Sequence, residues 1–154
     1  GITNVSASIA AAANSGGGGK AKFQVNGACF LSQTAQRAMP FGSSTGESTS
    51  FSYITTYMIP ADCKLVRVHT CSQSNAGTVT LKAYTIPDAT ADNTAISNGT
   101  LLQTVSVDNH NAGDPFEFTF GSTGTISKGK KFGLTVESDT NPNGFRFTAY
   151  FEEV

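Results

Sequence analysis

The sequence predicts an all-β protein, an antiparallel β-sandwich built as an eight-stranded jelly roll and preceded by an extended N-terminal arm. The clearest observation is phenylalanine at every second position, at Phe116, Phe118 and Phe120 and again at Phe145 and Phe147. Because side chains of an extended strand alternate between its two faces, this spacing lines one face with aromatic rings. Composition agrees, since charged residues make up 14% of the chain against the usual ~25% and Gly reaches 16 residues, as in turn-rich β proteins.

The 154 residues divide into two regions. Residues 1–22 are predicted to form a flexible arm, with an alanine run at 10–13 and a glycine hinge at 16–19. An alanine run this short is marginal as an isolated helix, so we expect it to order only against a partner surface; a disordered tail is the other interpretation. Residues 23–154 form one sandwich domain, because a chain of this size buries roughly 68 to 70% of its unfolded surface.

Eight runs of alternating apolar residues predict the strands, at the spacing expected of a sandwich. They are 23–31, 51–59, 63–71, 78–85, 101–107, 115–120, 131–138 and 145–153. The second run has four alternating apolar side chains on one predicted face: Phe51, Tyr53, Tyr57 and Ile59.

Three connections carry clear turn signals. Pro60 ends the second predicted strand, since proline cannot donate to the ladder. Turns at 74–77 and 127–129 are predicted to form hairpins with the strands that follow. The polar stretch 87–99 is long for a hairpin connection, so we expect it either to cross between sheets or to project outward.

Charge and cysteine usage narrow the class of protein. A net charge of −1 and a pI near 6.1 lack the basic footprint of nucleic-acid binders, so no nucleic-acid partner is expected. No apolar run reaches the ~18 residues of a membrane span and no secretory signal is recognisable, so we expect no membrane partner. The three cysteines, Cys29, Cys63 and Cys71, imply no disulfide framework and fit a reducing origin.

His69 is the first candidate metal ligand. By strict alternation it shares a face with Cys63, Leu65, Arg67 and Cys71, and neighbours two apart on a strand lie close enough to share a zinc ion. No paired Cys-x-x-Cys or His-x-x-x-His motif supports this reading. We therefore expect a half-buried strand histidine and no metal site.

Asp108, His110 and Asp114 form the second cluster, in the loop predicted after the fifth strand. Such a group is compatible with calcium or with acid–base chemistry, but the EF-hand spacing is missing and the neighbouring Asn and Gly residues are ordinary turn formers. No Gly-x-Ser-x-Gly elbow presents a serine nucleophile. A turn is favoured, and we expect no catalytic residue, no cofactor and no enzymatic activity.

Lys128, Lys130 and Lys131 form the single basic cluster and are predicted to ring a hairpin tip. A solvated turn is the favoured interpretation. The alternative is an electrostatic contact with an acidic neighbouring subunit.

Three segments carry a resemblance to a known group of proteins: 57–68 (YMIPADCKLVRV), 74–81 (SNAGTVTL) and 126–136 (ISKGKKFGLTV). Over 51–154 the chain resembles β-sandwich virion proteins of tailed bacteriophages. The resemblance implies a non-enzymatic capsid decoration (cement) protein that binds the major capsid protein or other virion subunits. It also implies a homo-oligomer, with a trimer favoured, on the capsid surface of a virion assembled in the host cytoplasm.

A different class remains as an alternative. A tail-fibre or receptor-binding module would recognise host glycans through loop 86–100, with Tyr53, Tyr57 and Tyr84 as stacking faces. The absence of Trp weakens this alternative. A hydrolase acting on cell envelopes is a residual third possibility, recognisable by a strongly shifted carboxylate or histidine in a cleft.

Overall fold

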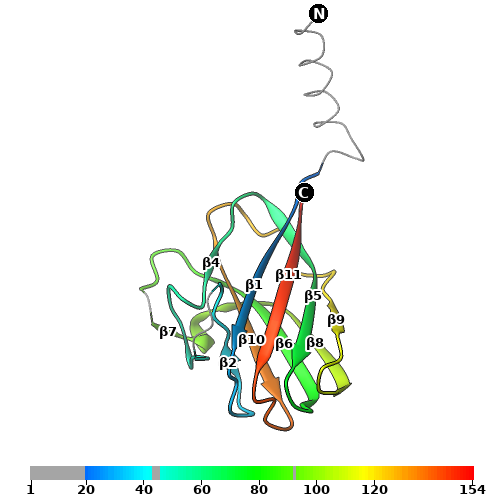
Figure 1. Ribbon diagram of the computed structural model, residues 1–154. Helices are drawn as coiled ribbons and strands as arrows, with labels where there is room; N and C mark the ends of the chain where they lie inside the picture. The colour runs from blue at the N-terminus through cyan, green and yellow to red at the C-terminus, as the bar shows by residue number, and fades with distance from the viewer. Residues whose placement is uncertain (1–19, 43–45, 92) are drawn as a thin grey trace, which may run out of the picture.

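The computed structural model describes residues 20–42, 46–91 and 93–154, and it shows two packed antiparallel sheets with a small third sheet beside them (Figure 1). The predicted alanine run and glycine hinge of the arm lie outside the described residues. The first described strand begins at Lys22.

The first sheet, sheet A, has four strands. Their order is β1 (Lys22–Cys29), β11 (Phe145–Glu153), β5 (Cys63–Ser72) and β9 (Phe116–Thr119). Chain entry and chain end lie side by side in this sheet, because Glu153 N–H donates to the Ala21 carbonyl at 2.9 Å (Figure 1).

The second sheet, sheet B, packs against sheet A. Its order is β2 (Arg37–Ala38), β10 (Lys131–Ser138), β6 (Gly77–Ile86) and β8 (Thr100–His110), and β4 (Tyr57–Met58) also pairs with β10. The third sheet joins β3 (Ser50–Phe51) to β7 (Thr94–Ala95), which a 3₁₀ helix at Ile96–Asn98 follows.

The strand pairing is that of a jelly roll. Leaving aside β4, the two sheets contain eight strands along the chain: β1, β2, β5, β6, β8, β9, β10 and β11. The first pairs with the eighth, the second with the seventh, the third with the sixth and the fourth with the fifth. This nested pairing arises when one long hairpin rolls up into two facing sheets. The predicted fold class, an all-β jelly-roll sandwich, is confirmed.

Aromatic rings fill the space between the sheets. Phe118, Phe120, Phe145 and Phe147 are each no more than 2% exposed, as their alternation predicts. Rings from the two sheets meet edge to face, the geometry that aromatic pairs favour, as between Phe132 and Phe151 at a centroid distance of 5.2 Å. The bounds of the predicted strands 131–138 and 145–153 also match the observed ones.

The predicted strand 51–59 is wrong. Its ends lie in β3 and β4, and a turn separates them, so Tyr53 is 77% exposed whereas Phe51 is buried. The cause is local, since Ser52 N–H donates to Thr55 Oγ1 at 2.8 Å and Thr55 N–H donates to the Ser52 carbonyl at 3.1 Å. Hydroxyl side chains thus compete with the β-ladder for backbone groups. The second strand of the jelly roll is instead the two-residue β2.

The predicted hairpins are also wrong. Turn 74–77 joins β5 in sheet A to β6 in sheet B, and turn 127–129 precedes β10 after a crossing from β9. The long stretch 87–99 was expected either to cross between sheets or to project outward, and the first of these is wrong. It connects β6 and β8, which are neighbours in sheet B. It does not cross between sheets but contributes β7 to the third sheet.

A bulge in β5 breaks the predicted alternation around His69. Leu65 pairs with Phe151 and Arg67 pairs with Tyr150, so Val66 is the extra residue. Before the bulge, Cys63 and Leu65 are buried, and after it the buried set moves to Val68, Thr70 and Ser72. The predicted shared face of Cys63 with His69 is therefore wrong.

Candidate functional site

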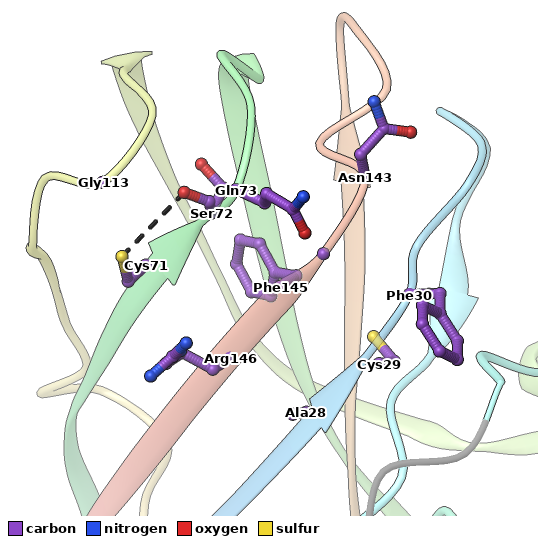
Figure 2. A pocket seen from close by; sticks show the side chains of 11 residues that line it. Ala28, Cys29, Phe30, Cys71, Ser72, Gln73, Gly113, Asn143, Phe145 and Arg146 are labelled. Atoms are coloured by element: carbon purple, nitrogen blue, oxygen red, sulfur yellow. Dashed lines mark hydrogen bonds between the residues drawn. The ribbon is translucent and has the colours of Figure 1, made fainter.

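A pocket lies at one end of sheet A, where β1, β5 and β11 approach their connecting loops (Figure 2). Its volume is about 440 Å³. It is lined by Ala28, Cys29, Phe30, Cys71, Ser72, Gln73, Gly113, Asn143, Gly144, Phe145 and Arg146.

Strand register places these side chains on two sides of β11. Arg146 lies between Ala28 and Cys71, and its exposed guanidinium is on the Cys71 side of the pocket in Figure 2. Cys29 and Phe30 line the other side, and Phe30 is 68% exposed. The pocket therefore combines one cation, two amide side chains and an exposed aromatic ring.

The thiols in this pocket do not form a reactive pair. Burial, and then the negative charge of Glu47, raise the pKa of Cys29 to about 12, so its thiol stays protonated at neutral pH. The Cys71 thiol donates to the Ser72 carbonyl, with Sγ and O 3.9 Å apart (Figure 2). Cys29 and Cys71 lie two strands apart, roughly 9.6 Å, which exceeds the ~7 Å limit for a disulfide. All three cysteines of the chain are free.

Behind the pocket, His110 forms a buried polar bridge between the sheets. Its Nδ1 lies 3.0 Å from Ser72 Oγ and its Nε2 lies 2.7 Å from Thr70 Oγ1. The ring is fully buried and stacks on Phe116 at 4.2 Å, and this burial lowers its pKa below the usual 6.5. A serine–histidine pair of this kind lacks the carboxylate that orients a catalytic histidine, because a threonine hydroxyl occupies that position.

The predicted cluster of Asp108, His110 and Asp114 does not come together. His110 is the last residue of β8 rather than a loop residue, and it points into the core, whereas both carboxylates are exposed. Asp108 accepts a hydrogen bond from Thr78 Oγ1 at 2.9 Å. The predicted turn is present at 111–114, where Asp114 N–H donates to the Asn111 carbonyl.

His69 lies on the outer face of sheet A in a group that the sequence did not reveal. Its Nε2 is 3.7 Å from Glu117 Oε2, and its ring meets the Tyr150 ring edge-on at 4.9 Å. The Arg67 guanidinium carbon lies 4.5 Å from the centroid of the same tyrosine ring. Alternation places Arg67 beside His69, but only the register across β11 and β9 brings Tyr150 and Glu117 to them. Across the described ranges, no three His, Cys, Asp or Glu side chains are grouped to hold a metal ion.

Two of the three clustered lysines, Lys130 and Lys131, bind groups of the loop that follows β6. Lys130 Nζ lies 2.8 Å from Asp88 Oδ2, and Lys131 Nζ donates to the Thr90 carbonyl at 2.9 Å. The Lys130 hydrogen bond, followed by its charge, lowers the pKa of Asp88. The turn at 127–130 is therefore tied to the loop after β6, and Lys128 is the exposed member of the cluster.

The three candidate stacking tyrosines do not form one platform. Tyr84 is 7% exposed, accepts a hydrogen bond from Gln36 and packs on Phe51. Tyr57 is half-buried and packs against Phe41, whereas Tyr53 is 77% exposed. The predicted stacking role of Tyr84 is therefore wrong.

A search of the described residues for a helix long and apolar enough to cross a membrane finds none. No family model matches the sequence, and no curated protein matches it.

Three solved structures with distant similarity to this chain come from viruses. A chain in the structure of infectious bursal disease virus, Gx strain, is 10% identical with a TM-score of 0.42; the match covers 87% of this chain and 32% of that one. A chain in the acid-stable capsid of Helicobacter pylori bacteriophage KHP30 is 10% identical with a TM-score of 0.40, over 86% and 90% of the two chains. A chain in the capsid asymmetric unit of cyanophage Pam1 is 13% identical with a TM-score of 0.37, over 88% and 86%. All three are distant structural similarities, with TM-scores below 0.5.

Proposed function

We propose that this protein is a non-enzymatic structural protein of a virion, and specifically a capsid decoration protein that binds and stabilises a phage head. The observation that carries the proposal is the nested jelly-roll pairing of its eight main strands. Jelly rolls occur in viral capsid domains, in lectins and in cupins. Among these classes, the resemblance of residues 51–154 to tailed-phage virion proteins favours the virion.

The chemistry of the pocket and of the buried network also favours a structural role. Both nitrogens of His110 are occupied by hydroxyl groups, and the Cys29 thiol is held protonated, so neither is prepared for proton transfer or nucleophilic attack. A polar bridge of this kind stabilises the contact between two sheets.

The proposed partners are the major capsid protein or other virion subunits, with a symmetric homo-oligomer, most simply a trimer, as the unit that binds. The proposed location is the outer surface of the virion. Stabilisation of the head follows from mass action, because a protein that binds only the assembled shell shifts the equilibrium toward it.

Binding to undecorated phage capsids tests the proposal. The purified protein is first sized by light scattering and then mixed with capsids, with and without residues 1–19. Stoichiometric binding that requires residues 1–19 supports the decoration role, provided that circular dichroism shows the shortened chain to be folded. A folded monomer that leaves capsids unbound contradicts it.

One observation favours the receptor-binding alternative. A second pocket of about 310 Å³ lies on the outer side of sheet A and is lined by Lys22, Phe23, Gln24, Val66, Arg67, Tyr150, Phe151 and Glu152. An aromatic ring beside amide, guanidinium and carboxylate groups can stack on a sugar and hydrogen-bond its hydroxyls. A glycan array decides the matter: hits lost in Tyr150→Ala but kept in Tyr53→Ala support this alternative, and an array without hits rejects it.

A further inference from the structure

Strand β8 is a long sheet edge with a free side. β6 pairs with one side of it along Thr100–His110. On the other side, no described residue makes a backbone–backbone hydrogen bond to Leu101–Asn109, and the one hydrogen bond there is Ser122 N–H donating to the Gln103 side chain at 2.9 Å. An edge of this kind presents a row of unpaired N–H and C=O groups, which another strand can use.

The other sheet edges are short or partly engaged. β9 has four residues and β2 has two. β1 is longer, but its Asn26 carbonyl accepts from Gly42 N–H at 2.8 Å. β8 contains neither lysine nor proline, the residues that usually protect an edge, and Asp108 is its one charged residue. Register irregularities lie near both its ends, so the regular part of the edge is 103–107.

The apolar face of sheet B is also incompletely covered at its β8 edge. Val79 and Leu81 of β6 are completely buried. Their partners across the ladder, Val107 and Val105, point the same way and are only partly buried. A further strand beside β8 would cover both valines, and it needs apolar side chains on that face and polar ones on the face of Ser106.

Residues 3–9 of this same chain have that pattern. The apolar residues Val5, Ala7 and Ile9 alternate with Asn4, Ser6 and Ser8, and residues 1–19 contain no charged side chain. We propose that the free edge of β8 binds residues 3–9 of a neighbouring copy as an added antiparallel strand. This inference deepens the proposed function and rests on it for the expectation of a homo-oligomer.

The homo-oligomer expected from the proposed function favours a neighbouring copy as the source. Residues 1–19 join the domain at β1, whereas β8 is at the opposite edge of the other sheet (Figure 1). The path to the chain's own β8 crosses three strand spacings of ~4.8 Å and the ~10 Å between the sheets, and residues 10–21 at ~3.3 Å each are long enough to span it, so the amide-exchange experiment below distinguishes the two sources. Asp62 joins two other segments at the end of the sandwich where the chain enters β1. Lys128 N–H donates to Asp62 Oδ1, and Val154 N–H donates to the Asp62 carbonyl.

Two full-length variants separate donor from acceptor. Val5→Pro with Ser6→Pro removes two consecutive N–H groups, so whichever of them faces β8 is lost, while β8 stays intact. Val105→Lys places an inward-pointing charge on the edge and leaves the arm intact. We expect each variant alone to remain monomeric by light scattering at concentrations where the wild type associates, and an equimolar mixture to form a heteromeric complex. Matched controls, Ala12→Pro with Ala13→Pro and Thr119→Lys on β9, should associate as the wild type does.

Amide hydrogen exchange gives a second readout that does not depend on Val105→Lys folding. Exchange at 103–107 should be at least ~10-fold faster in the Val5→Pro, Ser6→Pro variant than in the associated wild type, as expected when edge amides lose a partner. A monomeric wild type overturns the proposal. So does a result in which both folded variants still associate alone and do not form a heteromeric complex when mixed. A monomer whose 103–107 amides are nonetheless protected by residues 3–9 overturns the neighbouring-copy assignment. Capsid binding is measured independently, so complementation without capsid binding retains this pairing and rejects the virion role.

Discussion

Nε2 of His110 lies 2.7 Å from Thr70 Oγ1, and this hydrogen bond joins the two sheets inside the sandwich. Thr70 belongs to β5 in sheet A, and His110 ends β8 in sheet B. Ser72 occupies the other ring nitrogen, so both polar atoms of a fully buried imidazole have partners. A polar side chain is tolerated in a core when its hydrogen bonds are satisfied.

This arrangement predicts that acid destabilises the protein through His110. Burial lowers the pKa of His110 in the folded state below 6.5, so below pH 6.5 the unfolded chain binds more protons than the folded one. Its contribution to the free energy of unfolding is therefore complete above about pH 6.5 and decreases as the pH falls, by at most ~1.4 kcal/mol per pH unit. Urea unfolding between pH 5 and 8 measures the slope.

The other histidine of the chain supplies the control. His110→Gln should flatten the pH dependence between pH 5 and 6.5, whereas His69→Gln, on the outer face of sheet A, should leave most of it in place. An unchanged slope in folded His110→Gln contradicts the assignment.

Thiol labelling should discriminate among the cysteines. Burial raises the pKa of Cys29 to about 12 and that of Cys63 to about 11, while Cys71 is partly exposed. Because the thiolate is the reactive form, a maleimide at pH 7.5 should modify Cys71 first and the other two only on unfolding. Mass spectrometry counts the labels, and Cys71→Ser should abolish the fast phase. Rapid labelling of Cys29 in the folded protein would be inconsistent with its burial.

Gly133 should not tolerate a side chain. A Cβ at this position would lie 2.3 Å from the Phe51 ring, so Gly133→Ala should lower the free energy of unfolding by ~1–3 kcal/mol, as overpacking does. Gly121→Ala is the matched control, because a Cβ there meets nothing within 4 Å. Adding Phe51→Leu to Gly133→Ala should recover part of the loss relative to the sum of the two single changes. Strict additivity in denaturant unfolding would show that the ring is not the obstacle.

The Lys130 and Asp88 ion pair should order a loop rather than stabilise the domain. Both side chains are substantially exposed, so Lys130→Ala should leave Tm almost unchanged. Its measurable effect should be faster amide exchange and proteolysis at 87–91, because the loop loses one of its two lysine contacts and keeps only that of Lys131 with the Thr90 carbonyl. Lys128→Ala, which removes a side chain outside this pair, should not alter the loop. Equal exchange in the two variants would count against this role of the ion pair.

The long strands could be predicted from the sequence because each one buries one face. Alternation at Phe145 and Phe147 and at Phe132 and Leu134 reports burial directly, whatever the partner strand is. The strand predicted at 51–59 failed because Ser52 and Thr55 satisfy backbone groups locally, which an apolar pattern does not register. β2 was missed because two residues carry no periodicity.

Most of the candidate site could not be predicted from the sequence. The bulge at Val66 turns His69 away from Cys63, and no turn residue signals it. His110 bonds to Thr70 and Ser72, which lie 40 and 38 residues away from it along the chain. These contacts therefore depend on how the two sheets face each other. The aromatic spacing near Phe116 was the one available signal that the region around His110 is a core.

The sequence by itself determined the class of the fold, an all-β sandwich with alternating aromatic residues on its strands, because burial of one strand face is a local property. Only the tertiary structure decided which strands pair, that the turns at 74–77 and 127–129 cross between sheets, and that β8 is left with a free edge. Pairing is a long-range choice among strands of similar pattern. It is settled by how the two sheets together cover the core, which no short segment of the chain encodes.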